Sequence, residues 1–263
     1  MPKQNKPPYV GFHADMPGLY QMNRSILLKS SKKTQYLMKL VLVVAGSSHV
    51  GKPGFVKALN DQFWPVLQGK QRLHIFPGPI CCKSGGGIDD SDLFIRFAWN
   101  IAHEPGYEGQ VFVLVLGTND ASNPQLNQEV YAEKYRQLCK NLLKVPKLIL
   151  LPTSLLPRQH NPNRPKKNAN MLITSNTIKQ VCHDLRSLEE FTDRIKFINI
   201  HKDISEIGED EETGELVSIP LDGMLKADLV HLSPQAEPLV AKSILMSVNL
   251  LYNACFQPKS NTQ

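Results

Sequence analysis

Short apolar runs recur along the chain and alternate with segments in which apolar residues return every three or four positions. Near-continuous runs of this length predict strands buried on both faces, and the segments between them predict helices. Together they predict one α/β domain with a three-layer α/β/α architecture and about five parallel strands. The predicted strands are KLVLVVA (39–45), RLHIF (72–76), QVFVLVL (110–116), KLILLPT (147–153) and RIKFINI (194–200), and the predicted helices lie near 54–64, 90–102, 127–143, 171–190 and 234–252.

The segment 127–143 illustrates the helical pattern. Its apolar residues recur at a spacing of three to four, so we expect one face of this helix to pack on the sheet. The residues assigned to that face are Val130, Tyr131, Tyr135, Leu138 and Leu142.

Positive charge is concentrated before the first predicted strand. Residues 1–39 hold seven Lys or Arg against one acid, Asp15, and so account for the net charge of +6 of the whole chain. We expect a basic, mostly irregular leader (1–37), a nearly neutral domain (38–255) and a tail (256–263). The leader is either a solvated tail or a surface for nucleic acid or another anionic partner, through Lys3, Lys6, Arg24, Lys29, Lys32 and Lys33.

Cysteine spacing and hydropathy indicate the cellular compartment in which the protein is expected. The five cysteines show no C-x-x-C spacing, which disfavours a zinc site or a disulfide framework and predicts free thiols. No apolar run approaches the ~20 residues that a transmembrane helix needs, and the N-terminus lacks the apolar core of a secretion signal. We therefore expect a cytoplasmic protein without a transmembrane segment.

Two charged stretches follow the later strands. LPRQHNPNRPKK (156–167) carries Arg158 and Arg164 among prolines and asparagines that disfavour regular structure. EIGEDEETGE (206–215) is predicted to be a solvated excursion. The two arginines either favour an anionic substrate or pair with the acidic stretch.

Polar residues stand where the predicted strands end, which is the edge of a parallel sheet where ligands bind. GSSH (46–49) follows the first strand, SGGG (84–87) the second and GTND (117–120) the third, and DLVHLS (228–233) precedes the last helix. A serine hydroxyl becomes nucleophilic when a histidine takes its proton, and an aspartate can orient that histidine. Ser48, His231 and Asp228 fit these roles, while backbone N–H groups and the Asn119 amide fit an oxyanion hole.

The first of these motifs has a second interpretation. Gly46, Gly51 and Lys52 match G-x-x-x-x-G-K, the beginning of a phosphate-binding loop. That loop continues with a Ser or Thr that binds Mg²⁺, and here the residue is Pro53. Proline suits the first turn of a helix, so Gly51-Lys52-Pro53 predicts a helix start instead.

The order GSS, SGGG, GTND, DLVHLS resembles the SGNH (GDSL-like) hydrolases over residues 39–252. The resemblance implies a flavodoxin-like fold, no cofactor, and hydrolysis of small acyl esters or lipid esters. It also implies that Ser48 is the nucleophile, His231 the base and Asp228 its partner, with an oxyanion hole from Ser48, Gly85 and Asn119. One departure is Ser47, which stands where the family usually has aspartate.

The resemblance leaves a second function open. Some SGNH-like domains have lost catalysis and bind RNA, as in Oskar, and others occur in the first open reading frame of LINE-type retrotransposons. A basic leader before the domain is similar to both arrangements. The alternative to an esterase is therefore an inactive SGNH-like domain that binds RNA.

Overall fold

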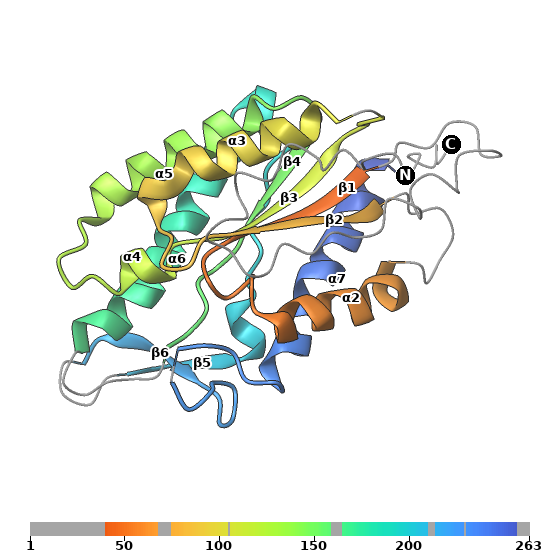
Figure 1. Ribbon diagram of the computed structural model, residues 1–263. Helices are drawn as coiled ribbons and strands as arrows, with labels where there is room; N and C mark the ends of the chain where they lie inside the picture. The colour runs from red at the N-terminus through yellow and green to blue at the C-terminus, as the bar shows by residue number, and fades with distance from the viewer. Residues whose placement is uncertain are drawn as a thin grey trace, which may run out of the picture.

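The computed structural model describes residues 40–67, 75–104, 106–158, 165–209, 214–228 and 230–256. A parallel four-stranded sheet with the order β2-β1-β3-β4 forms its centre (Figure 1). Because these strands all run parallel, the turns after β1, β2 and β3 lie at the same edge of the sheet. The strands are β1 (Leu40–Gly46), β2 (Ile75–Cys82), β3 (Gln110–Val115) and β4 (Leu148–Pro152).

Helices cover both faces of this sheet, so the predicted three-layer α/β/α class is confirmed (Figure 1). On β1, Leu42 and Val44 face the core that contains α2 and α7 residues, while Val43 and Ala45 face the core of α3, α5 and α6. This alternation is the period-two geometry of a strand. The helices are α2 (Pro53–Leu67), α3 (Ser91–Ala102), α4 (Thr118–Ala121), α5 (Gln128–Leu143), α6 (Pro165–Arg186) and α7 (Ala236–Phe256), with short 3₁₀ turns at Ile88–Asp90, Glu189–Phe191 and His201–Asp203.

The second strand extends further along the chain than its apolar pattern predicts. It was expected at 72–76, of which 72–74 lie outside the described residues, and it continues from Ile75 to Cys82 through Pro77 and Pro79. Proline cannot donate a hydrogen bond to a neighbouring strand and is therefore tolerated at sheet edges. Among the described strands β2 pairs with β1 alone, so it is an edge strand that accommodates both prolines.

The predicted fifth strand, 194–200, is not a regular strand. It lies beside β4 through two isolated parallel bridges, Leu150 to Ile195 and Thr153 to Ile198. Continuous pairing would require an N–H at position 152, which is Pro152. Proline has none, so the ladder is interrupted between the two bridges.

Two further expectations about the helices need correction. Val130 is 52% exposed, whereas Tyr131, Tyr135, Leu138 and Leu142 are buried. At about 100° per residue, Val130 lies a quarter turn away from the face that Tyr131 occupies. The stretch 156–167 is also not irregular throughout, because α6 begins at Pro165, a residue that suits the first helical position.

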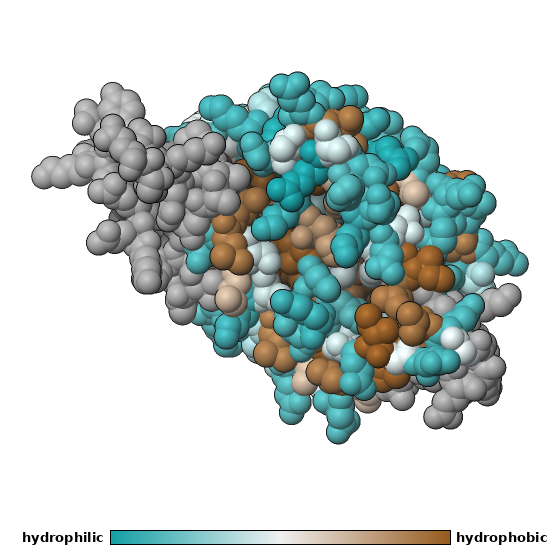
Figure 2. Space-filling view, turned by 180° about the vertical axis from the view of Figure 1, so that it is seen from behind, coloured by the Kyte–Doolittle hydropathy of each residue, from teal (hydrophilic) through white to brown (hydrophobic). Residues whose placement is uncertain are grey.

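The acidic stretch 206–215 belongs in part to a hairpin, and its described residues are mostly exposed, as a solvated excursion requires. Strands β5 (Ser205–Glu209) and β6 (Leu216–Pro220) pair antiparallel, and β6 packs against α6. Figure 2, viewed from behind, shows a largely hydrophilic surface interrupted by apolar patches. The large apolar side chains that are exposed include those of Ile207 and Leu216 on this hairpin.

Some sequence predictions lie outside the described residues. These are the leader 1–37 with its lysines and arginine, the tail, and Arg164. Among the described cysteines, Cys81, Cys82, Cys139 and Cys182 are free and buried. No helix in the described part of the chain is both long enough and apolar enough to cross a bilayer.

Candidate active site

The turn after β1 places Ser48 at the carboxyl edge of the sheet. Gly46 ends the strand against the backbone of Val115, where a Cβ atom would overlap the Val115 carbonyl. The next residue continues this contact, because the Ser47 N–H donates to Val115 O at 3.2 Å. Ser47 is 1% exposed, whereas Ser48 is only partly buried. The chain thus leaves the sheet with Ser48 accessible at its end.

His231 is carried by the segment that precedes α7. Leu225 and Leu232 form an antiparallel bridge, and the Lys226 N–H donates to the His231 carbonyl at 2.8 Å. The Ser233 hydroxyl then accepts from the backbone N–H groups of Gln235 and Ala236, which caps the start of the helix. These contacts fix the backbone on both sides of the histidine.

A chain of two hydrogen bonds joins three of the predicted site residues. The Nε2 atom of His231 lies 3.2 Å from Ser48 Oγ, and its Nδ1 lies 2.6 Å from Asp228 Oδ2. A carboxylate can only accept, so Nδ1 carries the proton and the Nε2 lone pair faces the serine. The structure therefore joins the predicted nucleophile, base and orienting carboxylate in one continuous chain of hydrogen bonds.

Asp228 is held in its ionised form by the residues that follow it. Its Oδ1 accepts from the backbone N–H groups of Val230 (3.0 Å) and His231 (2.9 Å). The backbone and ring N–H groups of His231, followed by the Val230 N–H, hold the Asp228 pKa well below its ordinary range. The carboxylate is thus available to stabilise a positively charged imidazole.

Asn119 is positioned by the turn after β3. Gly117 adopts φ +119°, a conformation that favours glycine, and a Cβ there would overlap the Tyr131 hydroxyl. The Asn119 side chain is fixed at both ends: Nδ2 donates to Gly86 O at 2.8 Å, and Oδ1 accepts from Arg158 Nη2 at 3.0 Å. One Nδ2 hydrogen remains for another acceptor.

The glycine loop after β2 lies against Asn119 through Gly86. The Gly86 N–H donates to Lys83 O and the Gly87 N–H donates to Asp90 Oδ2, both at 3.0 Å. No hydrogen bond from the Gly85 N–H to a described residue occurs, and Gly85 is exposed with φ +69°. The loop therefore keeps the Gly85 N–H available, and no hydrogen bond joins Gly85 to Ser48 within the described chain.

Asp120 anchors this loop, a role that sequence reasoning missed. Its two carboxylate oxygens lie 3.0 and 3.2 Å from the Ile88 backbone nitrogen, and it packs against Gly87. Burial raises the pKa of Asp120, and the Ile88 N–H partly opposes that shift. The sequence signal that could have indicated this role is the position of Asp120 directly after Asn119 in GTND.

His49 is a second residue that the sequence interpretation left without a role. It follows Ser48 directly, is 4% exposed, and its Nδ1 is buried without a partner among the described residues. Its ring centroid lies 5.2 Å from that of His231. Burial, helped by the nearby Arg158 cation, lowers the pKa of His49 to about 3, so this imidazole is neutral.

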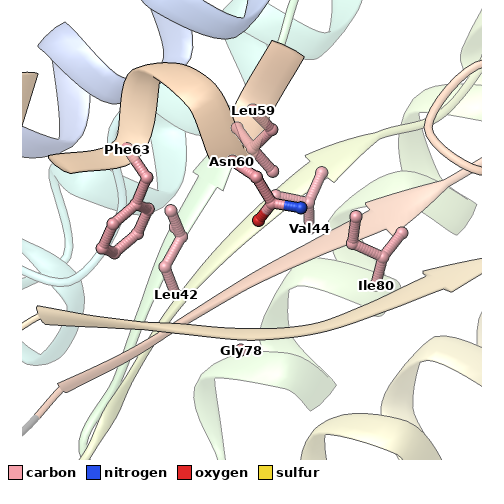
Figure 3. Close-up of a pocket in the computed structure, with 7 residues that line it drawn as sticks. All are labelled: Leu42, Val44, Leu59, Asn60, Phe63, Gly78 and Ile80. Atoms are coloured by element: carbon pink, nitrogen blue, oxygen red, sulfur yellow. The ribbon is translucent and has the colours of Figure 1, made fainter. Parts of the chain in front are cut away.

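An open groove of about 460 Å³ adjoins Asn119. Its lining combines apolar side chains such as Leu126 and Val130 with acids and amides, including Asp89 and Gln125. A separate void of about 10 Å³ lies under α2, lined mainly by core residues such as Leu42 and Phe63 (Figure 3). A space of that size holds at most one water. The groove is lined by Gly85 and Asn119 but by none of Ser48, Asp228 and His231, so it adjoins the glycine loop beside the triad.

The residues that match the start of a phosphate-binding loop have structural roles here. A Cβ on Gly51 would overlap the Cys82 sulfur, and one on Gly54 would overlap the Glu237 carboxylate. Pro53 begins α2, as its sequence position predicted. Both glycines therefore serve close packing around a helix start. Within the described residues, no group of three His, Cys, Asp or Glu side chains is arranged to hold a metal ion.

Comparisons with known proteins identify the fold. No protein-family model and no curated protein matches the sequence. An acetyl xylan esterase is 16% identical with a TM-score of 0.53, over 80% of this chain and 100% of that one. A GDSL-like lipase from Bacteroides thetaiotaomicron is 15% identical with a TM-score of 0.52, over 86% and 96%. A lipase/acylhydrolase from Enterococcus faecalis is 14% identical with a TM-score of 0.52, over 80% and 95%.

These similarities show that the chain has the fold of GDSL-like hydrolases. Because the sequence identities are low, these similarities establish only the arrangement of the sheet and helices. The chemistry must be inferred from the residues of the site itself. The reported structures give no support to the narrower retrotransposon or Oskar-like type, which stays a prediction.

Proposed function

We propose that this protein is a serine-dependent carboxylic ester hydrolase of the SGNH type. The observation that carries the proposal is the hydrogen-bond chain from Ser48 through His231 to Asp228 at the carboxyl edge of the sheet. That chain joins a nucleophile, a base and an orienting carboxylate, which together suffice for acyl transfer.

In the first step, Ser48 Oγ attacks the ester carbonyl while His231 Nε2 takes the serine proton. The imidazolium is stabilised by Asp228 through the Nδ1–H bond. His231 then returns the proton to the departing alcohol, and an acyl group remains on Ser48. A water molecule deprotonated by His231 releases the acid and restores the serine.

Negative charge on the carbonyl oxygen needs fixed donors during both attacks. The Ser48 N–H has no hydrogen bond to a described residue, and Asn119 has one free Nδ2 hydrogen. We assign both to the oxyanion hole, together with the Gly85 N–H. Asp120 acts as a positioning residue, because it ties the glycine loop to the turn that carries Asn119.

The proposal is tested with a fluorophosphonate probe, which modifies nucleophilic serines, and with p-nitrophenyl acetate. We expect the purified full chain to hydrolyse the ester and to carry the probe on Ser48, as located by peptide mass spectrometry. Ser48→Ala should lose both signals. The control is Ser247→Ala, a partly buried serine that lies eleven positions past the start of α7 and should retain both signals. Equal turnover by Ser48→Ala and the unsubstituted protein would exclude this assignment.

The RNA-binding alternative rests on residues outside the described part of the chain. The described site instead contains a connected triad, an arrangement that a domain retained only for binding does not require. Nucleic-acid affinity depends mainly on neutralised phosphates. Binding by the leader therefore stays a prediction that is independent of the esterase.

A further inference from the structure

Arg158 lies at the rim of the proposed oxyanion hole. It follows β4, and its Nη2 donates to Asn119 Oδ1 at 3.0 Å. The guanidinium is partly buried, and its Nε is shielded from solvent without a hydrogen-bond partner among the described residues. This desolvation lowers the Arg158 pKa.

No ion pair joins Arg158 to a described carboxylate. The acids of the site are already engaged: Asp228 with His231, Asp120 with the Ile88 N–H, and Asp90 with Lys83. Arg136 on α5 provides a contrast, since it pairs with both Glu133 and Asp184 at the surface. Arg158 is thus a cation left without a described anionic partner.

Burying part of a cation without a counter-charge is unfavourable, and an arginine fork binds carboxylates and phosphates in a fixed geometry. We propose that Arg158 determines specificity by binding an anionic group, a carboxylate or a phosphate, on the ester substrate. This inference rests on the proposed esterase function and names the substrate class for that site.

The hydrogen bond to Asn119 limits where the anionic group can be. One amide group and two hydrogen bonds of ~3 Å separate Arg158 Nη2 from the carbonyl oxygen of the substrate, so this nitrogen lies within about 8 Å of that oxygen. An anion that accepts a further hydrogen bond of ~3 Å from it lies within about 11 Å, an upper bound that admits a short acyl chain or a small alcohol. The anion therefore belongs to the part of the substrate next to the ester.

Two pairs of small esters test this, with acid release followed by pH-stat titration at pH 8. Ethyl hydrogen glutarate and ethyl glutaramate differ by a carboxylate on the acyl side. 2-Acetoxyethyl phosphate and 2-hydroxyethyl acetate differ by a phosphate on the alcohol side. We expect at least one anionic ester to be preferred by roughly 10- to 100-fold in kcat/KM, the range of a charge-assisted hydrogen bond.

Substitution of Arg158 separates charge recognition from support of Asn119. Arg158→Gln should abolish the preference for the anionic ester, and Arg158→Lys should restore part of it. The surface substitution Arg136→Gln removes an equal charge elsewhere and should leave the preference unchanged. If Arg158→Gln slows both esters of a pair equally, the residue only orients Asn119 and the inference is wrong.

The preference measured in the unsubstituted protein completes the test. Equal rates for both members of both pairs overturn the inference and leave the esterase intact. Absence of Ser48-dependent hydrolysis of every ester, the neutral ones included, overturns the proposed function itself.

Discussion

The Nε2 atom of His231 lies 3.2 Å from Ser48 Oγ although 183 positions separate the two residues in the chain. Neither residue belongs to a strand or a helix. Ser48 lies in the turn after β1, and His231 lies in the bridged segment before α7. The contact exists because β1 and α7 share one core, which brings the turn and the segment to the same edge of the sheet.

Replacing Asp228 with asparagine should lower kcat by roughly 10²–10⁴-fold. Asn cannot stabilise the imidazolium, and it favours the wrong tautomer of His231. Steady-state kinetics with p-nitrophenyl acetate measures the effect. Because half of the Asp228 side chain is exposed, the folded protein should survive the change, as a thermal unfolding scan can verify. A kcat within twofold of the original would refute the role of Asp228.

Removal of the Asn119 amide should cost about 10²–10³-fold in kcat, the usual effect of losing one oxyanion donor. The KM should change little, because the lost bond forms mainly in the transition state. Asn119→Ala is compared with Asn141→Ala on the surface of α5, which should match the original enzyme. A rise in KM at constant kcat would show that Asn119 binds ground-state substrate instead.

Substitution of Asp120 should reveal a positioning effect. Asp120→Ala leaves the Ile88 N–H without its acceptor, which costs about 1–3 kcal/mol of unfolding free energy. The loosened glycine loop should also reduce kcat. Asp120→Asn keeps an oxygen acceptor for the same N–H and should recover most of kcat. If the Asn variant is as slow as the Ala variant while both remain folded at the assay temperature, loss of the hydrogen bond to Ile88 does not explain the lower kcat.

His49 should make the fold sensitive to acid. Its pKa is about 3 in the folded protein and about 6.5 in an unfolded chain. Below pH 6.5 the unfolded state therefore binds a proton that the folded state does not, and stability falls as the pH drops toward 3. The loss from this group approaches about 1.4 kcal/mol per pH unit.

Urea unfolding of the original protein and of His49→Gln at pH 7 and pH 5 measures this contribution. The substituted protein should lose less stability between the two pH values, whatever its stability at pH 7. His103→Gln, on the surface end of α3, serves as the control and should keep the original slope. Identical slopes for His49→Gln and the original protein would show that His49 is protonated in the fold.

The sequence by itself determined the layers of this protein and the residue types of its site. Near-continuous apolar runs require a covered parallel sheet, and a polar group after each run must lie at its carboxyl edge. Ser48 and Asn119 could be named on that basis, and Asp228 and His231 from the Asp-x-x-His pair before the last helix; the structure brings His231 to Ser48 and Asp228. The apolar pattern ended β2 at residue 76 instead of Cys82, because edge strands tolerate the prolines that the pattern treats as breaks.

Only the tertiary structure decided which polar groups meet. The Arg158 contact with Asn119 and the Asp120 contact with Ile88 span 39 and 32 positions and have no periodic signal. The fifth strand is likewise interrupted because Pro152 lies opposite residues 194–200. The apolar pattern of either segment alone does not predict which residues pair across the two segments. Periodicity records burial along one segment, whereas hydrogen bonds between loops depend on how separate segments are packed.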